Sequence, residues 1–136
     1  MSKNRRDGFT LIEVLIVVTI MAVLAATIIP QFTTSANEAR QSQLSFNLHA
    51  LQSQVHLYHL QHNSLFPDVL TKLTVKTDLD STINVAGVYG PYLVGGVLPD
   101  NPNTKSNAAT ASADGVLKTG GGWLYNAATG QIWADE

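Results

Sequence analysis

The sequence has 136 residues, a formal net charge of −2 at pH 7 and no cysteine. This length fits one small domain. The slightly negative charge argues against a nucleic-acid-binding protein that depends on many phosphate contacts. Without cysteine the chain has no disulfide framework, which small exported domains often need.

The first eight residues form a basic leader. Lys3, Arg5 and Arg6 are opposed only by Asp7, so residues 1–8 carry +2 (three minus one) and the remaining side chains carry −4 (−2 minus +2). Positive flanks of membrane segments stay in the cytoplasm. We therefore expect the part of the chain that follows the apolar segment to face outward.

An apolar segment of 21 residues follows the leader, from Phe9 to Ile29, and Glu13 is its only charged residue. As a helix it would be about 31 Å long, which matches the hydrocarbon core of a bilayer. A carboxylate inside such a segment is costly and usually functional. Glu13 lies one helical turn after Phe9, near the end of the span, and it calls for a partner.

Gly8 followed by Phe9-Thr10-Leu11-Ile12-Glu13-Val14-Leu15 resembles the class III leader of type IV pilins and type II secretion pseudopilins. The resemblance implies cleavage after Gly8 by a membrane-embedded prepilin peptidase. It further implies N-methylation of the new terminus at Phe9, and a role for Glu13 as the assembly glutamate.

Three other interpretations of the N-terminus compete with this one. A secretory signal peptide is cut after its apolar region at small residues, as at Ala25-Ala26, but Glu13 would then lie in a discarded segment. Twin arginines suggest a Tat signal, yet Asp7-Gly8 interrupts its pattern. The third alternative is an uncleaved signal anchor that holds an unrelated outer domain.

Residues 30–62 are expected to continue the helix. Pro30 lacks the amide hydrogen that would bond the carbonyl of Ala26, so we expect a kink there. One apolar stripe recurs at spacings of four, three, four and three, as expected for a helix face that covers a sheet; its members are Leu44, Leu48, Leu51, Val55 and Tyr58. A second stripe on roughly the opposite face includes Ala39, Phe46, Ala50, Leu57 and Leu60, which with Phe32 and Ala36 could contact neighbouring subunits.

Residues 63–136 are expected to form a small β-rich region. Turn residues break the helix at 63–68, and 68–73 can form a short helical turn. The segments 98–103 and 107–113 are expected to be loops, the second at the surface.

The clearest sheet signal is a hairpin over 122–134, with aromatic side chains on one face, and 116–118 can add a strand. The predicted fold class is α+β: a long N-terminal helix packed, along its second half, on a small antiparallel sheet.

The globular part carries a second resemblance. Gly90-Pro91-Tyr92-Leu93, Leu98-Pro99, Asn101-Pro102, Gly122-Trp123-Leu124-Tyr125-Asn126 and Gly130-Gln131-Ile132 are similar to the globular half of major pseudopilins. Together the two resemblances imply a type IV pilin-like fold. They also imply four segments, which are a cleaved leader (1–8), a transmembrane and assembly helix (9–29), an amphipathic continuation of that helix (30–62) and a globular region (63–136).

No catalytic constellation is present in the sequence, and Gly120-Gly121-Gly122 precedes a strand rather than a helix, so it is interpreted as a turn. His56, His59 and His62 are spaced by three residues and His49 lies seven earlier. Two of them could share a metal, but no acid lies near in sequence. We interpret these histidines as a polar helix face.

Major pseudopilins often bind calcium in a C-terminal loop. Oxygen donors of the kind that calcium prefers occur at Asp100, Asn101, Asn103 and Asp114. However, Lys118-Thr119-Gly120-Gly121 stands where the family has an acidic loop, so we assign no metal and no other cofactor.

The resemblance implies a structural subunit, not an enzyme, that polymerises into a type II secretion pseudopilus. Its partners would be copies of itself, prepilin peptidase, minor pseudopilins, the inner-membrane assembly platform and the membrane, with no nucleic acid. It would cross the bacterial inner membrane once, with a cytoplasmic N-terminus and a periplasmic C-terminal region and fibre. The alternatives are a type IV pilin for adhesion, motility or DNA uptake, and an uncleaved signal-anchored binding module.

Overall fold

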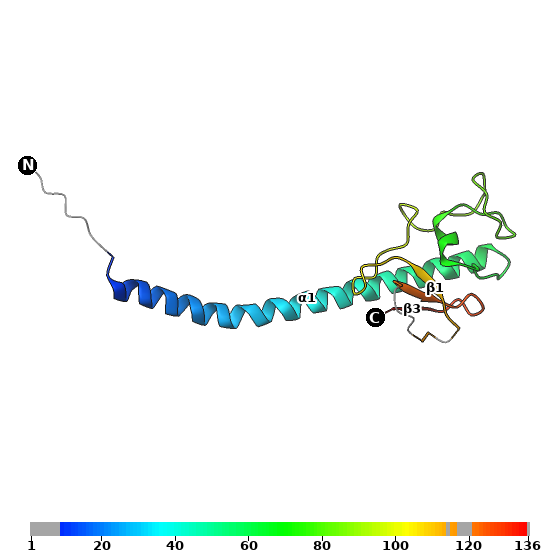
Figure 1. Ribbon diagram of the computed structural model, residues 1–136. Coiled ribbons are helices and arrows are strands. Elements are labelled where there is room, and N and C mark those ends of the chain that lie inside the picture. Colours follow the sequence, from blue (N-terminus) through cyan, green and yellow to red (C-terminus); the bar gives the residue numbers. More distant parts are fainter. Residues whose placement is uncertain (1–8, 114, 117–120, 136) are drawn as a thin grey trace, which may run out of the picture. The chain divides into compact units, whose positions relative to one another are not determined.

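The computed structural model describes residues 9–113, 115–116 and 121–135. The chain divides into two compact units, Met1–Ala39 and Arg40–Glu136. The long helix α1, Leu11–Gln61, supplies residues to both units (Figure 1). Its second part carries the core of the globular unit.

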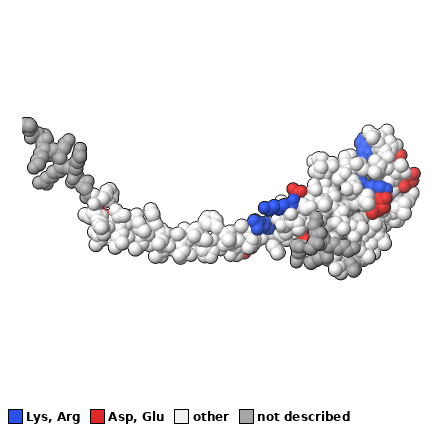
Figure 2. All heavy atoms as spheres, viewed as in Figure 1, with Lys and Arg blue, Asp and Glu red and all other residues white. Residues whose placement is uncertain are grey.

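The first unit is a stretch of helix with no core of its own. All its described residues, 9–39, are exposed, and Figure 2 shows almost no charged atoms on this stretch. Among the described residues, α1 is the one helix long and apolar enough to cross a membrane. Its threonine hydroxyls bond carbonyls within the same helix, as Thr19 Oγ1 does to Ile16 O at 2.8 Å. Such local bonds suit a helix surrounded by lipid.

In the second unit one face of α1 packs onto the core, as its apolar spacing predicts. Leu51, Val55 and Tyr58 have no exposed surface, and Leu44 and Leu48 pack against the same cluster. The cluster is completed by residues from the rest of the unit, which are Leu70, Leu73, Leu98, Trp123, Tyr125 and Ile132. The first stripe is therefore the core face of the helix.

A three-stranded sheet in the order β1-β2-β3 supplies part of this core. The strands are β1, Ala109–Ala111, β2, Trp123–Tyr125, and β3, Ile132–Ala134. The expected hairpin is confirmed, since β2 and β3 are antiparallel with Leu124 opposite Trp133. All three residues of β2 are buried, because this central strand is covered on both faces.

The sheet is mixed rather than wholly antiparallel. β1 pairs parallel to β2, with Thr110 opposite Leu124. The expectation that 107–113 is only a surface loop was therefore wrong. Alanine, which occupies two of the three positions of β1, is a weak strand former, and a parallel partner that returns through a long connection leaves no local signal. Of the possible strand at 116–118, only Val116 lies within the described residues.

Long-range polar contacts fix the loops around the sheet. Trp123 Nε1 donates to Pro99 O at 2.7 Å, and Tyr125 Oη donates to Pro67 O at 2.7 Å. The turn between β2 and β3 needs glycine at Gly130, where φ is +72° and a Cβ would collide with the ring of Phe66. The short helical turn expected near residue 70 is the 3₁₀ helix η1, Leu70–Thr74.

Candidate assembly site at the start of α1

Glu13 and Thr10 bond each other at the first turn of α1. The Thr10 amide and hydroxyl both donate to Glu13 Oε2, at 2.9 and 2.8 Å, and the Glu13 amide lies 3.4 Å from Thr10 Oγ1. This reciprocal pattern is a capping box, in which two otherwise unsatisfied helix amides find partners. The sequence interpretation missed the role of Thr10, although the spacing T-x-x-E is its signature.

The capping box leaves part of the carboxylate available. Both donated bonds converge on Oε2, and within the described part of the chain Oε1 of Glu13 accepts no hydrogen bond. Phe9 precedes the box and is 87% exposed. Gly8, the expected cleavage residue, lies outside the described residues. The site therefore offers one oriented carboxylate oxygen close to the expected new N-terminus.

Pro30 lies inside α1, and helix continues on both sides of it. The hydroxyl groups of Thr33 and Thr34 donate to Pro30 O at 3.0 and 3.1 Å. Such bonds from threonine to the preceding turn favour local bending. The kink itself stays a prediction.

His62 lies in the core rather than on a polar face. Its Nδ1 is 2.9 Å from Tyr58 O, its Nε2 is 2.9 Å from Thr77 Oγ1, and its ring stacks on Tyr58 with centroids 3.8 Å apart. His49 and His56 are exposed. The interpretation of all four histidines as a polar face was therefore wrong for His62, whose partner Thr77 comes from a loop 15 residues later.

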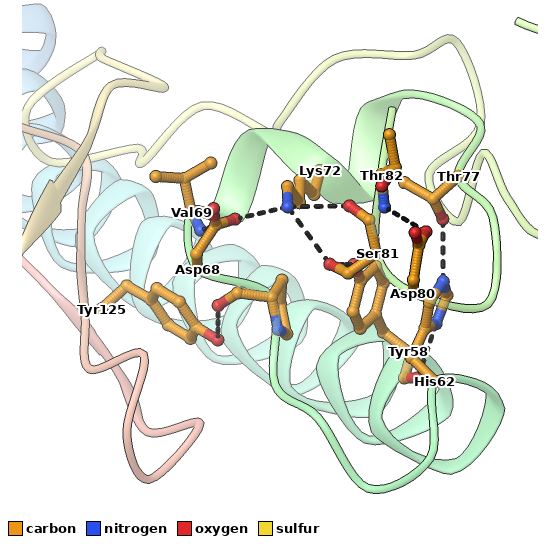
Figure 3. Close-up of polar contacts among 11 residues, drawn as sticks. Tyr58, His62, Asp68, Val69, Lys72, Thr77, Asp80, Ser81, Thr82 and Tyr125 are labelled. Carbon is orange, nitrogen blue, oxygen red and sulfur yellow. Dashed lines mark hydrogen bonds and ion pairs between the residues drawn. The ribbon is translucent and has the colours of Figure 1, made fainter. Parts of the chain in front are cut away.

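A lysine ties η1 to the loop that follows it (Figure 3). Lys72 Nζ donates to Ser81 O at 2.8 Å and pairs with Asp68 Oδ1 at 3.0 Å. The hydroxyl of Tyr58 also bonds Ser81 Oγ. None of these groups is a nucleophile activated by a neighbouring base. The cluster therefore has a structural role, in which it connects the helices to the loop.

Two tyrosines of the globular unit are held in their neutral form. Burial, with smaller contributions from Tyr58 and Tyr89, raises the pKa of Tyr92 to about 12. Burial likewise raises the pKa of Tyr125 above its usual range, with Tyr58 and Asp68 adding to the effect. Both phenols donate to protein oxygens, Tyr92 to Gln61 Oε1 at 2.8 Å.

Asn101, one of the oxygen donors considered for calcium, bonds groups within the chain instead. Asn101 is buried and its amide donates to Gly122 O and Asp135 O, at 2.8 and 2.6 Å. Its Oδ1 accepts from the Asn103 amide at 2.9 Å, so its side chain is fully used within the chain. Asp114 lies outside the described residues. Within the part of the chain that the structure describes, no three His, Asp or Glu residues are grouped to hold a metal.

Comparison with known proteins supports the interpretation of the N-terminus. Residues 3–29 match the family model of the prokaryotic N-terminal methylation motif. The type II secretion system core protein G of Aeromonas hydrophila is 31% identical over 84 residues, which are 62% of this chain and 54% of that protein. The protein of the same name from Vibrio cholerae is 35% identical over 68 residues, 49% of this chain and 46% of that protein.

A pilus protein is also similar. The type IV wide pilus major component PilA4 of Thermus thermophilus is 28% identical over 120 residues, 78% of this chain and 92% of that protein. No solved structure matches the chain. The chain spans about half the length of the secretion proteins it matches.

The methylation motif, the long apolar helix and the small sheet packed on the second part of that helix together define a type IV pilin-like protein. Within that class, the chain is similar over about half of its length to the proteins named type II secretion system core protein G.

Proposed function

We propose that this chain is the main structural subunit of a type II secretion pseudopilus, a helical fibre that aids the export of folded proteins. The observation that carries the proposal is the methylation motif over residues 3–29, whose helical part is exposed and, apart from Glu13, uncharged up to Ile29. Such a surface needs either lipid or other copies of the helix to cover it.

The assembly step that we propose uses Glu13. Cleavage after Gly8 creates an amine at Phe9, which is then methylated, and the Glu13 carboxylate of an incoming subunit meets this amine on a neighbour. A carboxylate in a medium of low polarity is costly, and a nearby opposite charge relieves that cost. The pair therefore selects the register of the helices more than it adds net stability.

Thr10 supports this role by orienting the carboxylate. Its amide and hydroxyl bind Oε2, which leaves Oε1 for the amine of the neighbouring subunit. The small residues Ala22, Ala25 and Ala26 allow the helices to approach closely in the fibre core.

The remaining parts of the proposal follow from the class of protein. The chain crosses the inner membrane once, with the basic leader in the cytoplasm and the globular unit and fibre in the periplasm. Prepilin peptidase, minor pseudopilins and the inner-membrane assembly platform are its partners. The function is structural, without catalysis.

The test of this proposal is mass spectrometry of the full chain extracted from membranes of cells that contain a prepilin peptidase. We expect an N-terminal Phe9 with one added methyl group, and no processing in a Gly8→Val variant. An intact leader in the wild-type chain would instead support an uncleaved signal anchor with a binding module, and the proposal would fail.

A type IV pilus for adhesion, motility or DNA uptake is the second candidate. It is favoured by the match to the Thermus pilus protein, which covers 92% of that protein. Deleting the chain's gene separates the two candidates. Loss of secreted enzymes from the medium supports the pseudopilus, whereas loss of surface pili with normal secretion supports the pilus.

A further inference from the structure

The face of α1 opposite the core carries an exposed apolar stripe. Phe46, Leu57 and Leu60 are 73, 41 and 78% exposed. At about 100° per residue they lie within about 60° of one another, on the side opposite Leu51 and Val55. We call these three residues the back stripe.

Neither lipid nor the chain itself accounts for the back stripe. Phe46 comes 17 residues after Ile29, the end of the apolar span. The core of the globular unit covers only the opposite face of the helix. A phenylalanine and two leucines aligned on one exposed face offer an apolar surface that another protein can cover.

A second apolar surface of the same unit lies after η1. A hollow of about 370 Å³ is lined by Val75, Ile83, Val85 and Pro91, together with Thr74 and Lys76. Apolar residues that line the hollow are exposed to solvent, Ile83 to 59% and Val85 to 94%. Lys76 is the one charged residue among those lining the hollow, and it is exposed, so its long side chain can keep the ammonium group in water while an aromatic or aliphatic side chain enters.

We propose that the back stripe of one subunit docks into the hollow of a second copy of this chain. Two identical stripes facing each other would close a two-fold dimer, whereas a fibre needs contacts between two different surfaces. The stripe also continues the assembly segment, because the same helical spacing recurs upstream at Phe32 and Ala39. The inference rests on the proposed fibre and adds to it a specific contact outside the membrane.

The chain has no cysteine, so single cysteines can test this contact directly. Full-length chains with Phe46→Cys and with Val85→Cys are co-expressed in peptidase-containing cells, and the fibres are oxidised. Ser45→Cys is the matched control, because Ser45 is exposed and adjacent along the helix but points about 100° away. We expect a 46–85 cross-link, no 45–85 cross-link, and no 46–85 cross-link when both chains also carry Glu13→Val.

A second measurement uses the yield of sheared fibres relative to the amount of subunit in the membrane. Phe46→Ser should lower this yield about tenfold, the effect of losing a contact of modest strength, while Ser45→Ala leaves it unchanged. Wild-type yield from Phe46→Ser, or 46–46 cross-links in place of 46–85, would overturn the docking contact and leave the fibre intact. Absence of fibres from the unmodified chain would instead overturn the proposed function, and the docking contact with it.

Discussion

The two units of the chain differ in how far they bury the same kind of side chain. Leu24 in the first unit is 53% exposed, whereas Leu51 in the second, on the same helix α1, has no exposed surface. The second unit buries its apolar side chains within one subunit. The first has none of its described residues buried and depends on lipid or on other subunits. Burial within one subunit is therefore confined, among the described residues of α1, to the part that belongs to the second unit.

The hydrogen bonds of polar side chains also differ between the two units. In the first unit they bond within one or two turns, as Thr27 Oγ1 does to Leu24 O at 2.9 Å. In the second unit some of them also join distant segments, as Asn101 joins Asp135 across 34 residues. A helix that must leave lipid and enter a fibre keeps its polar groups satisfied in both places only if those bonds are local.

The comparison is tested most strongly by the same substitution at two positions of α1. Leu51→Ala should lower the free energy of unfolding of the globular unit by about 2–5 kcal/mol, through lost burial and a residual cavity. Leu24→Ala should change it by less than about 0.5 kcal/mol, as surface substitutions do. Denaturant titration of the full chain in detergent, followed by tryptophan fluorescence, measures both. Equal losses would show that the two units are not energetically distinct.

The next effect concerns Asn101. Asn101→Ala removes the donors to Gly122 O and Asp135 O, and leaving buried carbonyls unpaired should cost about 1–3 kcal/mol. Asn103 is exposed, so Asn103→Ala is the matched control and should have little effect. The urea midpoints of unfolding of the two variants measure both effects. An Asn101→Ala variant as stable as the wild type would contradict the role assigned to these hydrogen bonds.

The buried phenols predict an alkaline loss of stability in the globular unit. The pKa of Tyr92 is raised to about 12 from about 10 in an unfolded chain. Its contribution is therefore complete below about pH 10 and is lost as the pH rises toward about 12. Tyr92→Phe should flatten this decline, as seen in unfolding midpoints between pH 8 and 11.5. A decline as steep as that of the wild type would exclude Tyr92 as its source.

Pro30→Ala should have the smallest effect on stability, because Pro30 lies in the unit without a core. The unfolding of the globular unit should not change. If Pro30 bends α1, spin labels at Ala22→Cys and Asn37→Cys should be farther apart on average after Pro30→Ala, since alanine restores the amide donor. An unchanged distance distribution would show that the helix is not kinked there.

Local patterns were sufficient to predict much of the fold. The spacing of Leu51, Val55 and Tyr58 identified the core face of α1, and the turn at Gly130 identified the hairpin. β1 was missed because its alanines and threonine become a strand only beside β2. His62 was misinterpreted because burial depends on Thr77, which a loop brings to the helix end.

The candidate site shows a similar limit. Glu13 stood out in the sequence because a lone charge in an apolar segment is costly. Its bonds to Thr10 lie within one turn and were accessible to sequence reasoning. Whatever meets Oε1 belongs, in this account, to another copy of the chain, and a single subunit cannot contain it.

The central claim, that Glu13 makes an assembly contact in addition to capping α1, is tested most directly by the fibre yield of Glu13→Val. The variant loses a charge that membrane insertion penalises, so its membrane level should equal that of the wild type. The Phe9 amine loses its partner, and an unpaired buried charge costs about 3–5 kcal/mol. We expect few or no fibres after shearing, with a normal membrane level. Wild-type fibre yield from Glu13→Val would contradict the account.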